Sequence, residues 1–164
     1  MVVSQLEAIS KRDSEDIAAR FKARAAEMRR RVGEAIADEI VDLSPVDTGT
    51  YVMAHVAGAG DTADTGERTS HGKQRNRNAS QFKNLARGNL KRSVLAEAIE
   101  ASGEIWFRNR AAHAARVEFV GWPAPLFGNP NSSGPGPYHV YSKTAAKVPT
   151  IIRRVAAEMG MQAR

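Results

Sequence analysis

The chain has four histidines, and their spacing decides whether they could hold a metal ion or carry out acid–base chemistry. They stand far apart, at His55, His71, His113 and His139, with no pattern of acidic residues beside them. A metal site needs two or three ligands that converge on one place. The sequence also lacks a phosphate-binding P-loop, a dinucleotide glycine fingerprint and a nucleophile elbow. We therefore expect no enzymatic activity, no metal, no cofactor and no small-molecule substrate.

A second set of chemically active side chains is cationic and lies in the middle of the chain. The basic residues between positions 68 and 92 are Arg68, Lys73, Arg75, Arg77, Lys83, Arg87, Lys91 and Arg92. Lys and Arg on a loop can neutralise DNA phosphates without reading bases. Alternatively, the same charge keeps a loop solvated or docks it on an acidic partner. The stretch lacks the interleaved aromatic residues that stack on bases, which favours the second interpretation.

Composition sets broad limits on the class of protein. The chain has 164 residues, 42% of them hydrophobic and 26% charged, which is typical of one globular domain with a buried core. It has no cysteine, so disulfides and thiolate metal sites are excluded. The apolar run at the N-terminus is too short for a signal peptide, and no stretch has the ~20 apolar residues of a membrane span. We expect a soluble protein without membrane contact.

The basic and apolar residues need elements to position them, and the first is a long helix over about residues 14–42. Its apolar stripe is Ile17, Phe21, Ala25, Met28, Val32, Ile36, Ile40 and Leu43. Carboxylates near residue 13 fit the positive end of the helix dipole, and Glu27 and Arg31 are spaced for an ion pair. Gly33 indicates close packing inside the helix. A stripe of this length, roughly 40 Å, needs a sheet or a neighbouring subunit to cover it.

A corner follows this helix at Pro45, Val46, Asp47, Thr48 and Gly49. Pro45 cannot continue a helix, and Gly49 permits a positive φ. Residues 50–57 then read as a strand, and residues 103–108 read as a second strand. Trp106 and Phe107 point to opposite faces of that second strand. One of them is therefore expected to meet the long helix while the other faces outward.

The remaining segments alternate between irregular stretches and helices. Residues 58–80 have no apolar periodicity and predict a long surface loop. A helix is expected over about 89–101, after a less regular turn and a weak point at Gly88-Asn89. Residues 122–137 form a second irregular arm, rich in proline. The last helix, 138–161, contains Pro149, which either kinks it or begins a second helix.

The exposed aromatic residues are candidates for a subunit interface, where such side chains are enriched. These candidates are Trp106, Trp122 and Phe127. The alternative is that the chain covers them itself. Few strand–helix–strand alternations are present, which favours an antiparallel sheet. The sequence therefore predicts one α+β domain, in which a long N-terminal helix, a second helix and a kinked C-terminal helix pack on a small antiparallel sheet.

The corner has a family resemblance. Pro45, Val46, Asp47, Thr48 and Gly49 resemble the PVDTG signature of tail-completion proteins of long-tailed bacteriophages, small neck proteins that form rings between head and tail tube. Downstream, the chain is similar to the family's second motif at Asn109, Ala114, Val117, Glu118 and Phe119. Two positions depart from it: His113 stands where the family usually has tyrosine, and Val120 separates Phe119 from the glycine. The resemblance covers most of the chain in order.

The resemblance implies a structural virion protein with no catalytic role. It would form a hexameric ring that completes the tail and joins the tail tube to the head-closure or connector protein. The virion would be assembled in the host bacterial cytoplasm, and the basic loop could touch packaged DNA. The alternative is a small basic nucleic-acid-binding protein, suggested by the net charge of +6 and a pI near 10.0. Such a protein would bind DNA with a steep salt dependence, whereas a ring component would form concentration-dependent oligomers.

Overall fold

The computed structural model of the chain describes residues 2–46, 49–59, 78–100, 104–121 and 136–161. The elements within these ranges, in order, are α1 (Val2–Leu43), α2 (Thr50–Met53), β1 (His55–Ala59), α3 (Ala79–Glu100), β2 (Ile105–Asn109), α4 (Ala114–Phe119) and α5 (Val140–Glu158). The two strands pair antiparallel, with His55 opposite Asn109 and Ala59 opposite Ile105. The predicted α+β fold with a small antiparallel sheet is confirmed.

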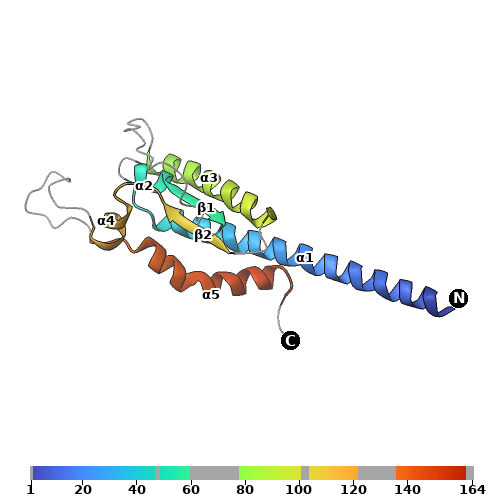
Figure 1. Cartoon of the computed structure of the whole chain (residues 1–164). Helices are drawn as coiled ribbons and strands as arrows, with labels where there is room; N and C mark the ends of the chain where they lie inside the picture. The colour runs from blue at the N-terminus through green and yellow to red at the C-terminus, as the bar shows by residue number, and fades with distance from the viewer. Residues whose placement is uncertain (1, 47–48, 60–77, 101–103, 122–135, 162–164) are drawn as a thin grey trace, which may run out of the picture.

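The C-terminal part of α1 forms the centre of the body, with the sheet, α3 and α5 around it (Figure 1). Both flanking helices run antiparallel to α1. In the first half of α3, Arg87 pairs with Asp42 at the end of α1, whereas Val94 farther along α3 lies against Gly33. The N-terminal part of α1 leaves this body and projects beyond it (Figure 1).

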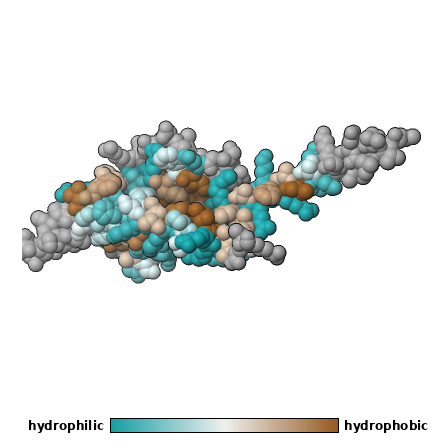
Figure 2. Space-filling model, turned by 90° about the horizontal axis from the view of Figure 1, so that it is seen from below, coloured by the Kyte–Doolittle hydropathy of each residue, from teal (hydrophilic) through white to brown (hydrophobic). Residues whose placement is uncertain are grey.

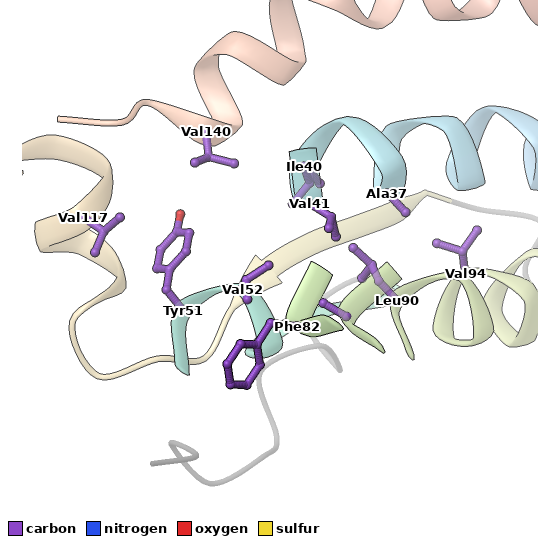
Figure 3. Close-up of a cluster of buried hydrophobic side chains, with 11 residues drawn as sticks. Ala37, Ile40, Val41, Tyr51, Val52, Phe82, Leu90, Val94, Val117 and Val140 are labelled. Carbon is purple, nitrogen blue, oxygen red and sulfur yellow. The ribbon is translucent and has the colours of Figure 1, made fainter. Parts of the chain in front are cut away.

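The hydrophobic core forms where α1, α2, α3, α4 and α5 meet (Figure 3). Its buried members are Ala37, Ile40, Val41, Tyr51, Val52, Phe82, Ala86, Leu90, Val94, Val117 and Val140. Ile105 and Phe107 of β2 pack against this cluster from the sheet. The helices therefore contribute most of the core, and the sheet closes one side of it.

The long first helix is confirmed, but its predicted start at residue 14 is wrong, because α1 begins at Val2. The residues before 14 contain no glycine or proline that would end a helix, so the acidic residues near 13 lie inside it. The expected pair of Glu27 and Arg31 forms at 2.6 Å. Close packing at Gly33 is also confirmed, since a Cβ there would lie 2.6 Å from Val94 Cγ1.

The strand predicted over residues 50–57 is wrong in its first half, because Thr50–Met53 form the short helix α2 and β1 begins at His55. Gly49, at φ 82°, sits at the N-terminus of α2, and its carbonyl accepts a bond from the Met53 N–H at 3.0 Å. A helical turn lets the neighbouring residues Tyr51 and Val52 both enter the core. In a strand they would point to opposite faces.

The helix predicted from 89 is in reality α3, which runs without interruption from Ala79, so the expected break at Gly88-Asn89 is wrong. Asn78 and Gln81 cap its start reciprocally, each backbone N–H donating to the other side chain at 3.0 Å. Phe82, Ala86, Leu90 and Val94 then fall on one buried face. This continuous apolar face outweighs the helix-weakening effect of one glycine.

The irregular segments are shorter than predicted where they can be compared. Gly58 and Ala59 belong to β1, and Ala79 and Ser80 belong to α3, while residues 60–77 lie outside the described part. Of the predicted arm 122–137, only residues 136 and 137 are described. The C-terminal helix α5 begins at Val140 rather than 138 and ends at Glu158, with Pro149 inside it, so no second helix begins there.

Candidate functional site

The strongest candidate site is a buried polar junction at which the corner, the end of β2 and the start of α5 meet. Gly49 anchors the corner: its φ of 82° favours glycine, and a Cβ would lie 2.3 Å from Cε1 of the Phe82 ring. Val46 packs against the core, and Pro45 is half-buried. Asp47 and Thr48 lie outside the described residues. The corner therefore requires glycine at position 49 for two independent reasons.

A chain of hydrogen bonds runs through this junction from α1 to α5. The Ser44 hydroxyl donates to the Ile40 carbonyl at 2.6 Å, so it must accept from Nε2 of His55, which lies 2.7 Å away. The other ring nitrogen, Nδ1, then accepts from the Tyr141 hydroxyl at 2.8 Å. This assigns the Nε2–H tautomer to His55. Burial lowers the pKa of His55 to about 3, so the ring is neutral at pH 7.

Ser44 and His55 have the separation of a catalytic nucleophile and its base, which raises the question of whether they could act as a catalytic dyad. Both side chains are buried, at 3% and 5% exposure, which leaves no room for a substrate. The hydroxyl proton goes to the Ile40 carbonyl rather than to the ring. A histidine with a pKa near 3 is also a weak base at neutral pH. The pair joins α1 to β1 and does not form a catalytic dyad.

Glu118 supplies the N-terminal cap of α5. One carboxylate oxygen accepts from the Val140 N–H at 2.7 Å, and the other accepts from the Tyr141 N–H at 2.9 Å. A carboxylate at a helix N-terminus satisfies free N–H groups and interacts favourably with the helix dipole. Glu118 is only 5% exposed. Burial, together with the charge of Glu118, raises the pKa of the neighbouring Tyr51 hydroxyl.

Asn109 links the end of β2 to α2. Its side-chain amide donates to the Tyr51 carbonyl at 2.9 Å, and its side-chain oxygen accepts from the Ala111 N–H at 2.8 Å. The backbone continues the link, since the Arg110 N–H donates to the Ala54 carbonyl at 2.9 Å. The two motifs singled out in the sequence, 45–49 and 109–119, are therefore joined in space through residues 51–55.

The other members of the second motif divide between core and surface. Val117 is fully buried, and Ala114 packs against the core cluster. Phe119 points outward with 67% of its surface exposed, beside Val120 at 69%. The ring of His113 lies 6.4 Å from that of Tyr51. Within this motif Asn109, Val117 and Glu118 hold the fold together, whereas Phe119 is available for contact.

Of the eight basic residues between positions 68 and 92, the structure describes four: Lys83, Arg87, Lys91 and Arg92. Lys83 donates to the Asp42 carbonyl at 2.7 Å, and Arg87 pairs with Asp38 at 3.0 Å and Asp42 at 2.6 Å. These two cations therefore join α3 to α1. Arg68, Lys73, Arg75 and Arg77 lie outside the described residues. A role in DNA or partner contact stays a prediction for all eight.

Of the three candidate interface aromatics, the structure describes Trp106, which is 44% exposed on the outer face of β2. Phe107, the next residue, packs against the core cluster, so the predicted opposite orientation is confirmed. The Arg108 guanidinium lies over the Trp106 ring at 5.6 Å. Trp122 and Phe127 lie outside the described residues.

A charged cavity of about 350 Å³ lies between α1, α3 and α5. Its cations face carboxylates of the same chain: Arg30 pairs with Glu34 at 2.6 Å, and Lys91 pairs with Asp38 at 2.7 Å. Arg30 and Arg31 also hold the pKa of the partly exposed Glu27 at about 2. With its charges compensated in this way, the cavity offers no clear preference for an anion or a cation.

Sequence reasoning missed the hydrogen-bond chain of Ser44, His55 and Tyr141. Tyr141 lies 86 residues beyond His55, so no local spacing could reveal their contact. In the described ranges, no group of three or more His, Cys, Asp or Glu side chains could hold a metal ion. Nor does any helix there have the length and apolarity to cross a membrane. Comparisons of the chain with known protein families, curated proteins and solved structures found no match.

Proposed function

We propose that the protein is a structural component of the neck of a tailed bacteriophage, where it forms a ring that completes the tail and joins the tail tube to the head connector. The observation that carries the proposal is the junction. The two short motifs that resemble the tail-completion family come together there, and three of their residues make contacts that hold the junction in place. Gly49 fits against Phe82, Asn109 holds the Tyr51 carbonyl and Glu118 caps α5.

A ring needs outward-facing contact surfaces that a monomer leaves open, and the chain has them beside this junction. Phe119 and Val120 expose more than two thirds of their surface at the end of α4, at 67% and 69%. Trp106 exposes 44% on the outer face of β2. Exposed apolar and aromatic side chains of this kind mark protein–protein interfaces. In a ring they would contact the neighbouring subunit, whereas the buried junction would keep the subunit rigid.

The alternative, a nucleic-acid-binding protein, gains nothing from the described residues. Lys83 and Arg87 already pair with α1, as described above. The net charge of +6 remains its basis. The two functions differ in their dependence on concentration and salt, so one set of measurements separates them.

The test is negative-stain imaging and sedimentation of the full chain over a concentration series, with and without purified tail tubes. We expect annular particles of one diameter that bind the tube end, and Trp106→Ser should remove them without unfolding the subunit. The matched control is Leu85→Ser, which removes another apolar side chain with comparable exposure (38%) from the surface of α3. Absence of annular particles under all conditions overturns the proposal. DNA affinity that falls steeply with salt then favours the alternative.

A further inference from the structure

The projecting part of α1 has no cover from the helices that flank the rest of it. Arg24 donates to the Met159 carbonyl at 2.6 Å, so this residue marks where the end of α5 lies beside α1. From Arg24 back to Val2, α1 continues for roughly 30 Å at ~1.5 Å per residue. Figure 1 shows this part extending away from the body.

The described side chains of this part include two large apolar residues on one face. Ile17 is 61% exposed, and Phe21, one turn later, is 76% exposed. Figure 2 shows hydrophobic surface on the projecting helix, with polar residues beside it. Side chains four residues apart in a helix lie next to each other, so the two form a continuous apolar patch. Such a patch on a straight, isolated helix fits another helix.

The charges around this patch indicate which helix would bind it. An acidic block precedes the patch and a basic block overlaps and follows it: Asp13, Glu15 and Asp16, then Arg20, Lys22 and Arg24. Two copies of the segment aligned antiparallel bring each acidic block opposite the other copy's basic block. A parallel alignment brings like charges together. Asp16 and Arg20 are spaced for an ion pair within the helix, yet neither pairs with any described residue.

We propose that residues 13–24 of α1 bind the same segment of a second copy in an antiparallel helix pair. The two-fold axis passes near residues 18–19, which places Ile17 against the partner's Phe21 and Asp16 beside the partner's Arg20. Each contact occurs twice by symmetry. A two-fold contact closes after two copies, so it differs from the head-to-tail contact of a ring. The pair leaves Trp106 and Phe119 uncovered and does not depend on the neck function.

The first test measures the dimer dissociation constant by sedimentation equilibrium of the full chain. Phe21→Ser removes a buried phenyl ring from each half of the pair, and we expect the dissociation constant to rise at least 100-fold. Leu85→Ser is the control, because it removes an exposed apolar side chain from the surface of α3, outside residues 13–24 and outside the proposed ring contacts, and should leave the constant unchanged. A wild-type chain that stays monomeric at ~500 µM overturns the proposal. The proposal is also overturned if Phe21→Ser leaves the dissociation constant unchanged, or if both substitutions raise it equally.

The second test exchanges charges. Asp16→Lys and Arg20→Glu each place like charges opposite one another in the pair, so each variant alone should dimerise about tenfold more weakly. A mixture of the two restores both attractions and should form a heterodimer. The doubly exchanged protein should dimerise like the wild type. Rescue by mixing cannot come from a change in the stability of the isolated helix. Failure of both rescues removes the proposed register.

The third test fixes the orientation. The chain has no cysteine, so Ala8→Cys gives one site for a spin label. In the antiparallel pair the two labelled positions lie about 30 Å apart along the helix axes, whereas in a parallel pair they lie side by side. Pulsed electron paramagnetic resonance measures this distance directly. A short distance overturns the antiparallel assignment. Binding of the wild-type segment to DNA or to lipid vesicles in place of a second copy would show a different occupant.

Discussion

The two halves of α1 carry the same apolar spacing but differ in what covers it. In the body half, Ala37 and Ile40 are 0% and 1% exposed, and α3 and α5 pack on either side. In the projecting half, Ile17 and Phe21 are 61% and 76% exposed. The helix continues without a break between them. A hydrophobic stripe therefore identifies the face that will be covered, but it does not identify the chain that covers it.

The difference arises from where the neighbouring helices end. Arg24 contacts the Met159 carbonyl at the end of α5, and Gly33 meets Val94 in the last third of α3. Residues of α1 before Arg24 lie beyond that contact. The body half therefore contributes to the stability of the monomer, whereas the projecting half is available for association. Substitutions in the two halves of α1, and in the contacts of its covered half, test this division.

The largest contrast is expected between alanine substitutions in the two halves. Ile40→Ala leaves a cavity in the core and should lower the free energy of unfolding by about 3 kcal/mol. Phe21→Ala removes a larger side chain, yet it should change that free energy by less than about 0.5 kcal/mol. Urea denaturation at low micromolar concentration, where monomer dominates, measures both. Equal losses would show that the projecting half packs within its own chain.

The division of α1 into a covered and a projecting half could not be predicted from the sequence, because it depends on where other elements of the fold end. Periodicity correctly indicated a long first helix, its paired charges Glu27 and Arg31 and the close approach at Gly33. It did not indicate that residues 50–53 form a helical turn, because strand and helix both accept such a short apolar run. Nor did it indicate that α3 passes through Gly88, because the buried face from Phe82 to Val94 is a tertiary effect.

The next effect concerns Glu118, whose buried carboxylate caps the N-terminus of α5, one of the two helices that cover the body half of α1. Glu118→Gln replaces one accepting oxygen with an amide that cannot accept, so a buried N–H of Val140 or Tyr141 loses its partner. We expect a loss of about 2 kcal/mol in the free energy of unfolding. Glu158→Gln is the control: its exposed carboxylate faces Arg154 at 3.9 Å, and the change should be within about 0.5 kcal/mol. Similar losses for both would contradict the cap.

The candidate site was predicted in part, since the sequence singled out Gly49, Asn109 and Glu118 as motif positions. Their partners were not predictable. Glu118 bonds N–H groups 22 and 23 residues away, and Asn109 bonds a carbonyl 58 residues away. Likewise, His55 was one of four scattered histidines until the fold brought Ser44 and Tyr141 to its two ring nitrogens. Contacts of this range depend on how whole elements pack.

A smaller effect should appear in the pH dependence of stability through His55. Burial lowers its folded pKa to about 3, below the ordinary value of 6.5, so the unfolded chain binds the proton more tightly. The resulting stability is complete above pH 6.5 and is lost as the pH falls toward 3, with a slope of up to about 1.4 kcal/mol per pH unit. Urea denaturation between pH 6.5 and 5 measures it. In His55→Asn the slope over that range should flatten, and an unchanged slope would assign it to another group.

The smallest effects compare two helix glycines, one covered and one open. At Gly33 a Cβ would meet Val94 Cγ1 at 2.6 Å, and Val94 is fully buried and cannot move aside. Gly33→Ala should therefore lose about 1 kcal/mol despite the better helix propensity of alanine. At Gly88 a Cβ would have nothing within 4 Å, so Gly88→Ala should gain up to about 1 kcal/mol. Thermal denaturation of the two variants measures the difference. A gain in stability at both positions would show that α1 and α3 are not closely packed at Gly33. The close approach of the covered half of α1 to α3 would then be contradicted.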